Sequence, residues 1–190
     1  MTVYLDAGHG DKGDRYDPGA QLVGTPGDEG TEARLVRALR SLVAVELVAA
    51  GLQVAIVPDG PYRERHAWVR ERQQGARGRS LYLQLHGNAG QGTYALCEYD
   101  AQSEEGRRAA QIIVAELERL SQIRAGQVRA LESGERGYTC IQGIWPVRAC
   151  AAVLVEGAFL DTPAHAALWG DQMQAQARAI AAGCLAWAGR

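Results

Sequence analysis

Apolar and polar residues follow one another along the chain in a pattern that predicts strands and helices in turn. Short runs rich in Val, Leu and Tyr are typical of buried strands, which we expect at residues 3–5, 53–57, 80–86, 93–99 and 151–156. Apolar residues at helical spacing predict helices at residues 32–50, 62–75, 103–121, 162–169 and 172–187. Because alternating strands and helices are typical of α/β proteins, we predict a largely parallel, twisted sheet flanked by helices on both faces.

Three segments fit this pattern less well. Residues 11–30 contain many Gly, Asp and Pro residues, which predict a long loop. Residues 122–136 show no clear period and receive no assignment, whereas residues 138–141 have the composition of a short strand. The chain contains no internal repeat and no low-complexity linker, so we predict a single domain over residues 1–190.

The composition is that of a soluble globular protein, with 47% hydrophobic and 22% charged residues. A net charge of −2 argues against a nucleic-acid partner and against a polybasic membrane surface. No apolar run has the length of a transmembrane helix, so we expect no integral membrane segment. Met1 leads directly into the first strand without a signal peptide, and we therefore expect synthesis in the cytoplasm.

Cysteines and charged helices complete this picture. Cys97, Cys140, Cys150 and Cys184 form no Cys-x-x-Cys pair, which excludes a zinc ribbon and a thioredoxin motif. We expect four free thiols; a bridge is conceivable only between Cys140 and Cys150, which flank the turn-like residues 142–146. In the predicted helix at 62–75, charges alternate in sign, which indicates a solvated face.

Polar residues stand where predicted strands end and where the first long helix begins. Three strands end in His9, His86 and Glu156, and Glu32 opens the helix. In a parallel α/β sheet, strand carboxyl ends and helix amino ends share one edge, so these side chains can converge there. Two imidazoles and one carboxylate are a standard set for catalytic zinc, and a second carboxylate would then serve as a base.

Each of these residues also has a structural alternative, which for His9 is a turn in which the ring only packs or hydrogen-bonds. Glu32 could complement the helix dipole, and His86 could be a hydrogen-bonded core histidine. Glu156 closes a buried apolar strand, so it must be solvated at the edge, paired or functional. His66 and His165 lie on predicted helices among charged or small residues, and we expect both at the surface.

Five ordered blocks resemble the zinc-dependent N-acetylmuramoyl-L-alanine amidases of the amidase-3 family. They are Asp6-Ala7-Gly8-His9-Gly10, Asp17-Pro18-Gly19-Ala20, Glu32, Leu83 to Ala89, and Ala152 to Glu156 followed by Phe159-Leu160. The resemblance implies that residues 1–190 are one catalytic amidase domain, a peptidoglycan hydrolase. Such an enzyme cuts the amide bond between N-acetylmuramic acid and the L-alanine of the stem peptide. It further implies that His9, Glu32 and His86 hold Zn²⁺ and that Glu156 is the catalytic base.

The sequence departs from the family pattern at several positions. The loop before Asp17 is longer, and Gln84 replaces the usual Ser. Ala158 and Thr162 replace the usual Gly and Asn, and Glu29 is close enough in sequence to compete with Glu32 as the ligand.

The expected setting follows from the same resemblance. A single-domain amidase without a signal peptide most resembles a phage lysis enzyme, which reaches the bacterial cell wall after release. Peptidoglycan is then the partner, and we expect a monomer. The alternative is a related zinc amidohydrolase or carboxypeptidase that acts on soluble acyl-amino acids or peptides, with Arg70 or Arg72 holding a free carboxylate. A catalytically inactive peptidoglycan-binding module is disfavoured, because acids that converge without a metal are costly to keep.

Overall fold

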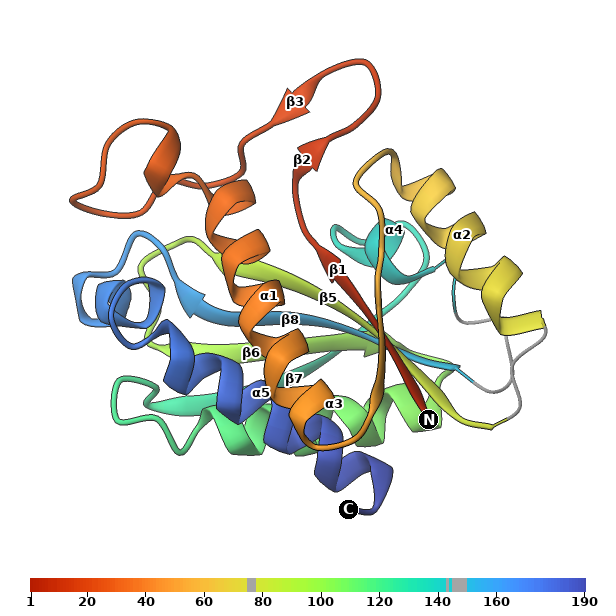
Figure 1. Cartoon of the computed structure of the whole chain (residues 1–190). Coiled ribbons are helices and arrows are strands. Elements are labelled where there is room, and N and C mark those ends of the chain that lie inside the picture. Colours follow the sequence, from red (N-terminus) through yellow and green to blue (C-terminus); the bar gives the residue numbers. More distant parts are fainter. Residues whose placement is uncertain (75–77, 143, 145–149) are drawn as a thin grey trace.

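A six-stranded sheet forms the centre of the computed structural model, which describes residues 1–74, 78–142, 144 and 150–190 (Figure 1). The strands, in spatial order, are β4 (Gln53–Ile56), β1 (Thr2–Ala7), β5 (Ser80–Asn88), β8 (Cys150–Phe159), β6 (Tyr94–Asp100) and β7 (Ala125–Leu131). Neighbouring strands are parallel except β6 and β8, which are antiparallel. The predicted α/β fold with a largely parallel sheet is confirmed.

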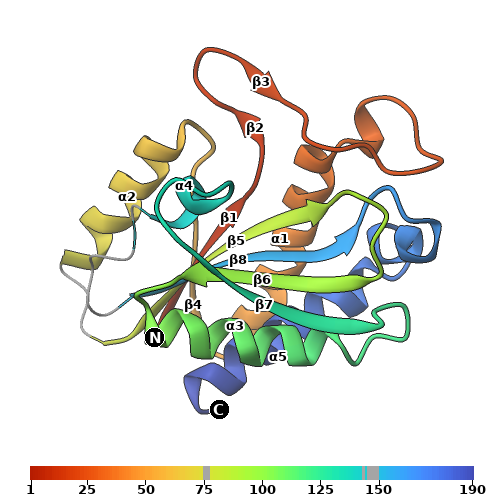
Figure 2. The ribbon, with the colours of Figure 1, turned by 180° about the vertical axis from the view of Figure 1, so that it is seen from behind.

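Helices cover both faces of this sheet (Figures 1 and 2). One face carries α1 (Glu32–Ala49), α3 (Glu104–Leu117) and α5 (Met173–Ala188), whose apolar residues form the larger core with the sheet. The other face carries α2 (Tyr62–Gln74) and α4 (Tyr138–Ile141) over a smaller core. A short 3-10 helix, η2 (Pro163–Trp169), connects β8 to α5. The expected helix end at Gly75 lies outside the described residues.

The alternation of side chains along the strands decides which residues reach the α2 face. In β5, Leu81, Leu83 and Leu85 belong to the larger core, whereas Tyr82 packs in the smaller one. Because successive side chains point to opposite faces, every second residue after Tyr82 also lies on the α2 side. In β1 and β8, too, every second side chain lies on the α2 side of the sheet. Polar residues therefore gather at the carboxyl ends of three neighbouring strands: Asp6, Gln84, His86 and Glu156.

Residues 11–30 contain more regular structure than the predicted loop. A small antiparallel pair, β2 (Gly10–Asp11) and β3 (Tyr16–Asp17), projects away from the main sheet (Figure 1). A 3-10 turn, η1 (Asp28–Gly30), then leads into α1. Strands of two residues carry no period that a sequence pattern could reveal.

Two further segments differ from the sequence-based expectation. Residues 138–141 form the single helical turn α4 and not a strand, because Gly137 adopts a left-handed conformation (φ 92°) that turns the chain just before them. A run of four residues is too short for its composition to decide between helix and strand. The unassigned region 122–136 contains β7, an edge strand whose central residues are exposed on both faces and so show no apolar alternation.

The prediction that His66 and His165 lie at the surface is wrong. Both rings are buried: His66 packs on α2 against the smaller core, and His165 lies on η2 with no exposed surface. His66 Nε2 lies 2.9 Å from the carbonyl oxygen of Cys140. His165 Nδ1 accepts a hydrogen bond from the Phe159 amide (2.9 Å), and its Nε2 lies 3.0 Å from the carbonyl of Gln122. Charged and small neighbours in sequence gave no sign of these contacts.

The contacts of His165 predict a pH dependence of stability. Its Nδ1 is an acceptor, so the folded state holds a neutral ring, and burial lowers the pKa of His165 below 6.5. The unfolded chain therefore binds an extra proton as the pH falls below about 6.5, and the free energy of unfolding decreases there. We expect His165→Gln to reduce the difference in unfolding free energy between pH 7.5 and 5.5, measured by urea denaturation with chelator present. Equal pH slopes in the two proteins would contradict this.

All four cysteines are buried free thiols. Of the turn expected between Cys140 and Cys150, residues 143, 145 and 146 lie outside the described residues. Within the described residues, none of the helices combines the length and the apolar character needed to cross a bilayer.

Candidate metal centre

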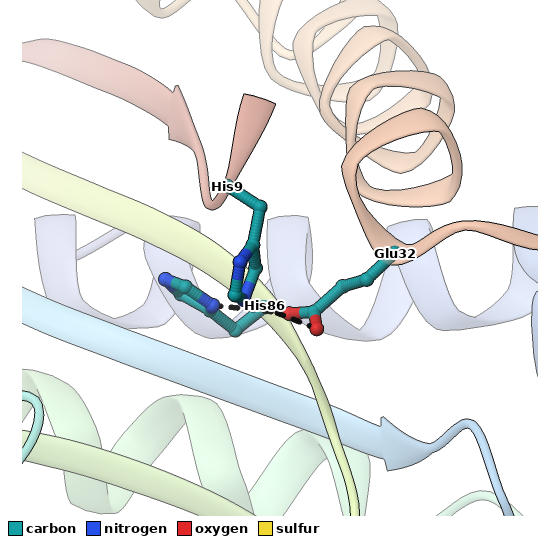
Figure 3. Close-up of side chains that lie close together, drawn as sticks. All are labelled: His9, Glu32 and His86. Carbon is teal, nitrogen blue, oxygen red and sulfur yellow. Dashed lines mark hydrogen bonds and ion pairs between the residues drawn. The ribbon is translucent and has the colours of Figure 1, made fainter. Parts of the chain in front are cut away.

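Three side chains that are distant in sequence meet at the carboxyl edge of the sheet. His9 follows β1, Glu32 opens α1, and His86 lies in β5 (Figure 3). Their potential ligand atoms all lie within 4.8 Å of one another. The Glu32 carboxylate contacts both rings: its Oε2 is 3.1 Å from His9 Nε2, and its Oε1 is 3.0 Å from His86 Nδ1. The structure thus brings together the three residues that the sequence predicts as ligands.

The backbone around His9 is shaped for a close approach. His9 has a φ of 59° and Gly10 a φ of 84°, so two successive left-handed residues turn the chain sharply after β1. A Cβ on Gly8 would lie 2.2 Å from the ring of His86. Glycine at this position therefore lets the two histidines stand edge to face, with ring centroids 5.0 Å apart.

Glu32 is fixed by the segment that precedes the helix. Its backbone amide donates to the carbonyl of Ala20 (2.9 Å), and the Ala20 amide donates back to Glu32 Oε2 (3.0 Å). The Gly87 amide donates to Oε1 (2.9 Å). Burial raises the pKa of Glu32, but hydrogen bonds with His86 and His9 outweigh it and hold this pKa well below its usual range. The buried carboxylate is therefore an anion ready to bind a cation.

Glu29, the competing candidate, lies elsewhere. It sits in the exposed 3-10 turn before α1, with 80% of its side chain accessible, and its Oε1 is 3.9 Å from Arg34. The structure does not bring it into the cluster.

A carboxylate also stands on the outer side of His9. Asp17 Oδ2 is 3.0 Å from His9 Nδ1, and Asp17 Oδ1 accepts a hydrogen bond from the Gly19 amide (3.1 Å). A carboxylate beside Nδ1 favours the proton on that nitrogen and leaves Nε2 for the ligand side. Asp17 lies in one of the blocks that carry the family resemblance, but its sequence position alone did not reveal this role.

Glu156 lies next to His86 across the sheet. The two residues are paired in register between β5 and β8, and their side chains share the α2 face. Burial raises the pKa of Glu156 to about 7; the nearby His86 opposes this, and the carboxylates of Glu98 and Glu32 reinforce it. A carboxyl group with a pKa near neutrality can both take and return a proton at physiological pH.

The charged face of α2 holds a residue that the sequence pattern misassigns. The alternating charges suggested a solvated side chain, but Arg65 is only 1% exposed. Its Nη1 donates to Asp6 Oδ1 (2.9 Å) and to the carbonyl of Ala7 (2.6 Å), and its Nη2 donates to the carbonyl of His9 (3.0 Å). This guanidinium thus holds the backbone that carries His9. The signal in the sequence was Asp6, an acid at the end of a buried strand, which requires a partner.

The residues present fit a catalytic zinc ion. Two ring nitrogens and a carboxylate oxygen form the donor set, and three protein ligands leave a position for water or substrate. The outer nitrogen of each ring lies beside a polar side chain, Asp17 for His9 and Gln84 for His86, as in known metal sites.

Comparison with known proteins places this chain in a family. A profile of the family described as N-acetylmuramoyl-L-alanine amidase, amidase-3, matches residues 3–186. The solved CwlD amidase from Clostridioides difficile, in complex with the GerS lipoprotein, has a TM-score of 0.74 and 20% identity over 99% of this chain and 98% of that one. The amidase AmiC2 of Nostoc punctiforme has a TM-score of 0.71 and 20% identity over 100% and 98% of the two chains.

A third solved structure is the catalytic domain of the CD27L endolysin, which targets Clostridia difficile. It has a TM-score of 0.69 and 20% identity over 98% of this chain and 97% of that one. A search among curated proteins finds no match. The profile covers nearly the whole chain and includes every block on which the resemblance was based. The chain belongs to the amidase-3 family of N-acetylmuramoyl-L-alanine amidases.

Proposed function

We propose that this protein is a zinc-dependent peptidoglycan amidase that hydrolyses the amide bond between N-acetylmuramic acid and the L-alanine of the stem peptide. The observation that carries the proposal is the largely buried cluster of His9, Glu32 and His86, with Glu156 in register beside His86. Its occurrence in an amidase-3 chain supports the assignment, since members of this family are generally zinc enzymes.

The chemistry divides between the metal and the chain. His9, Glu32 and His86 would hold the zinc, which supplies Lewis acidity toward the amide carbonyl and toward water. Glu156 accepts the proton of the attacking water, whose oxygen bonds to the carbonyl carbon. The same carboxyl group then returns the proton to the alanine nitrogen as the carbon–nitrogen bond breaks. The products are a lactyl carboxylate and a stem peptide with a free amino terminus.

The experiment that tests this function uses purified cell walls. We expect new amino-terminal alanine without new reducing sugar ends, with about one zinc per chain by elemental analysis. Chelation should remove both the metal and the release of amino groups, and added zinc should restore them. Full activity in a chelated, metal-free sample would contradict the proposal.

The alternative substrate class has less support. An enzyme for soluble acyl-amino acids needs a basic side chain to hold a free carboxylate, for which Arg70 and Arg72 were the candidates. The Arg72 guanidinium already stacks on Trp68, 3.7 Å from the ring centre, and lies 3.6 Å from Glu71. Hydrolysis of small acyl-amino acids in preference to cell walls would favour this alternative.

For the biological setting, we propose that the protein acts as a monomer on the bacterial cell wall during lysis, after synthesis in the cytoplasm. The shared fold with an endolysin catalytic domain supports a lytic role, although the CwlD amidase has the same fold. Loss of turbidity when purified protein is added to susceptible cells would support lysis. Action on isolated walls alone would favour a different role.

A further inference from the structure

Gln84 lies directly behind His86 and is fully buried. Its Oε1 is 3.1 Å from His86 Nε2. Its Nε2 donates two hydrogen bonds, to Asp6 Oδ2 (2.7 Å) and to the hydroxyl of Tyr82 (3.1 Å). The amide therefore uses both of its N–H groups on one side and presents its oxygen to the ring on the other.

The direction of this amide is set by Asp6. Arg65 donates to Asp6 Oδ1, and the Tyr82 hydroxyl donates to Asp6 Oδ2 (2.6 Å). A carboxylate paired with a buried guanidinium only accepts hydrogen bonds. A flipped Gln84 amide would set its oxygen against the Asp6 carboxylate and its N–H groups against His86. The amide nitrogen must therefore face Asp6, and the amide oxygen must face His86.

We propose that Gln84 is a positioning residue that fixes the tautomer of His86, an inference that rests on the metal site proposed above. Because Gln84 Oε1 can only accept, His86 carries its proton on Nε2. The nitrogen left for a metal is then Nδ1, whose contact with Glu32 Oε1 (3.0 Å) a bound ion would replace. His86 would thus hold the metal through Nδ1.

His9 is arranged in the opposite way. Asp17 lies beside its Nδ1, and its Nε2 faces Glu32. The two histidines therefore offer different ring nitrogens, each selected by a polar group on the far side of the ring. For His9 that group is a carboxylate at the partly exposed edge, whereas for His86 it is a neutral amide oriented by a buried ion pair.

The first test measures zinc affinity and not activity. Gln84→Leu keeps a similar volume but removes the acceptor for His86 Nε2. We expect zinc affinity, measured by competition with a chromogenic chelator, to fall about 10–100-fold. The matched control is Gln73→Leu, which removes another buried amide, one that contacts Ser80 at the opposite end of β5. We expect the control to bind zinc as tightly as the unmodified protein.

The second test reads the tautomer directly in the unmodified protein loaded with zinc. Long-range ¹H–¹⁵N correlation spectra should show His86 protonated on Nε2 and metal-bound through Nδ1. A proton on Nδ1 would overturn the proposal, even if Gln84→Leu fails to fold. Unchanged zinc affinity in a folded Gln84→Leu would also overturn it while leaving the proposed function intact. Failure of the unmodified protein to bind zinc would instead refute the proposed function itself.

Discussion

Glu156→Gln is expected to lower the rate of cell-wall hydrolysis by about 10²–10⁴-fold while the zinc content stays near one per chain. The amide keeps the shape of the side chain but cannot accept the water proton. Glu156 lies outside the three-residue cluster, so the substitution leaves every proposed ligand in place. Because Glu156 is partly desolvated with a raised pKa, replacing it by a neutral group should not lower the melting temperature.

The matched variant is Glu32→Gln, which makes the same chemical change inside the cluster. It replaces the carboxylate that both rings face with a neutral amide, so we expect loss of zinc together with loss of activity. The two variants are measured side by side for metal content, melting temperature and amino-group release. If Glu156→Gln loses zinc and Glu32→Gln retains it, the two glutamates have the opposite roles and the mechanism is wrongly assigned.

The convergence of His9, Glu32 and His86 could be expected from the sequence because it depends on topology. Strands that are predicted to be buried and parallel have their carboxyl ends at one edge of the sheet. A helix that follows such a strand begins at the same edge. The residues at those ends are then close without any local motif. The choice of Glu32 over Glu29 needed the family resemblance; the structure places Glu29 in an exposed turn outside the cluster.

The surroundings of the cluster could not be predicted in the same way. Arg65 and the exposed Arg63 share a helix with alternating charges, and only the packing of α2 on the sheet shows which one is buried. Gln84 stands in an apolar strand, where its contacts depend on Asp6 from a neighbouring strand. His165 was misassigned for the same reason. Pairwise contacts between distant elements leave no periodic signal in a single sequence.

Arg65→Met is expected to destabilise the fold by about 3–5 kcal/mol, because it leaves Asp6 as an unpaired charge in a site with no exposed surface. It also removes the donors to the carbonyls of Ala7 and His9, which hold the turn after β1. For a chain of 190 residues, this loss corresponds to a fall in melting temperature of roughly 6–20 °C. Urea denaturation with chelator present separates this effect from any change in metal binding.

Arg63→Met provides the control, because Arg63 lies two positions earlier on α2 with an exposed side chain. We expect this variant to stay within about 0.5 kcal/mol of the unmodified protein. Asp6→Asn added to Arg65→Met removes the stranded charge, so the double variant should recover part of the lost stability. If Arg65→Met is as stable as Arg63→Met, the buried ion pair does not hold α2 to the metal-site turn. If Arg65→Met is destabilised but Asp6→Asn restores nothing, the loss comes from the backbone carbonyls and not from the charge.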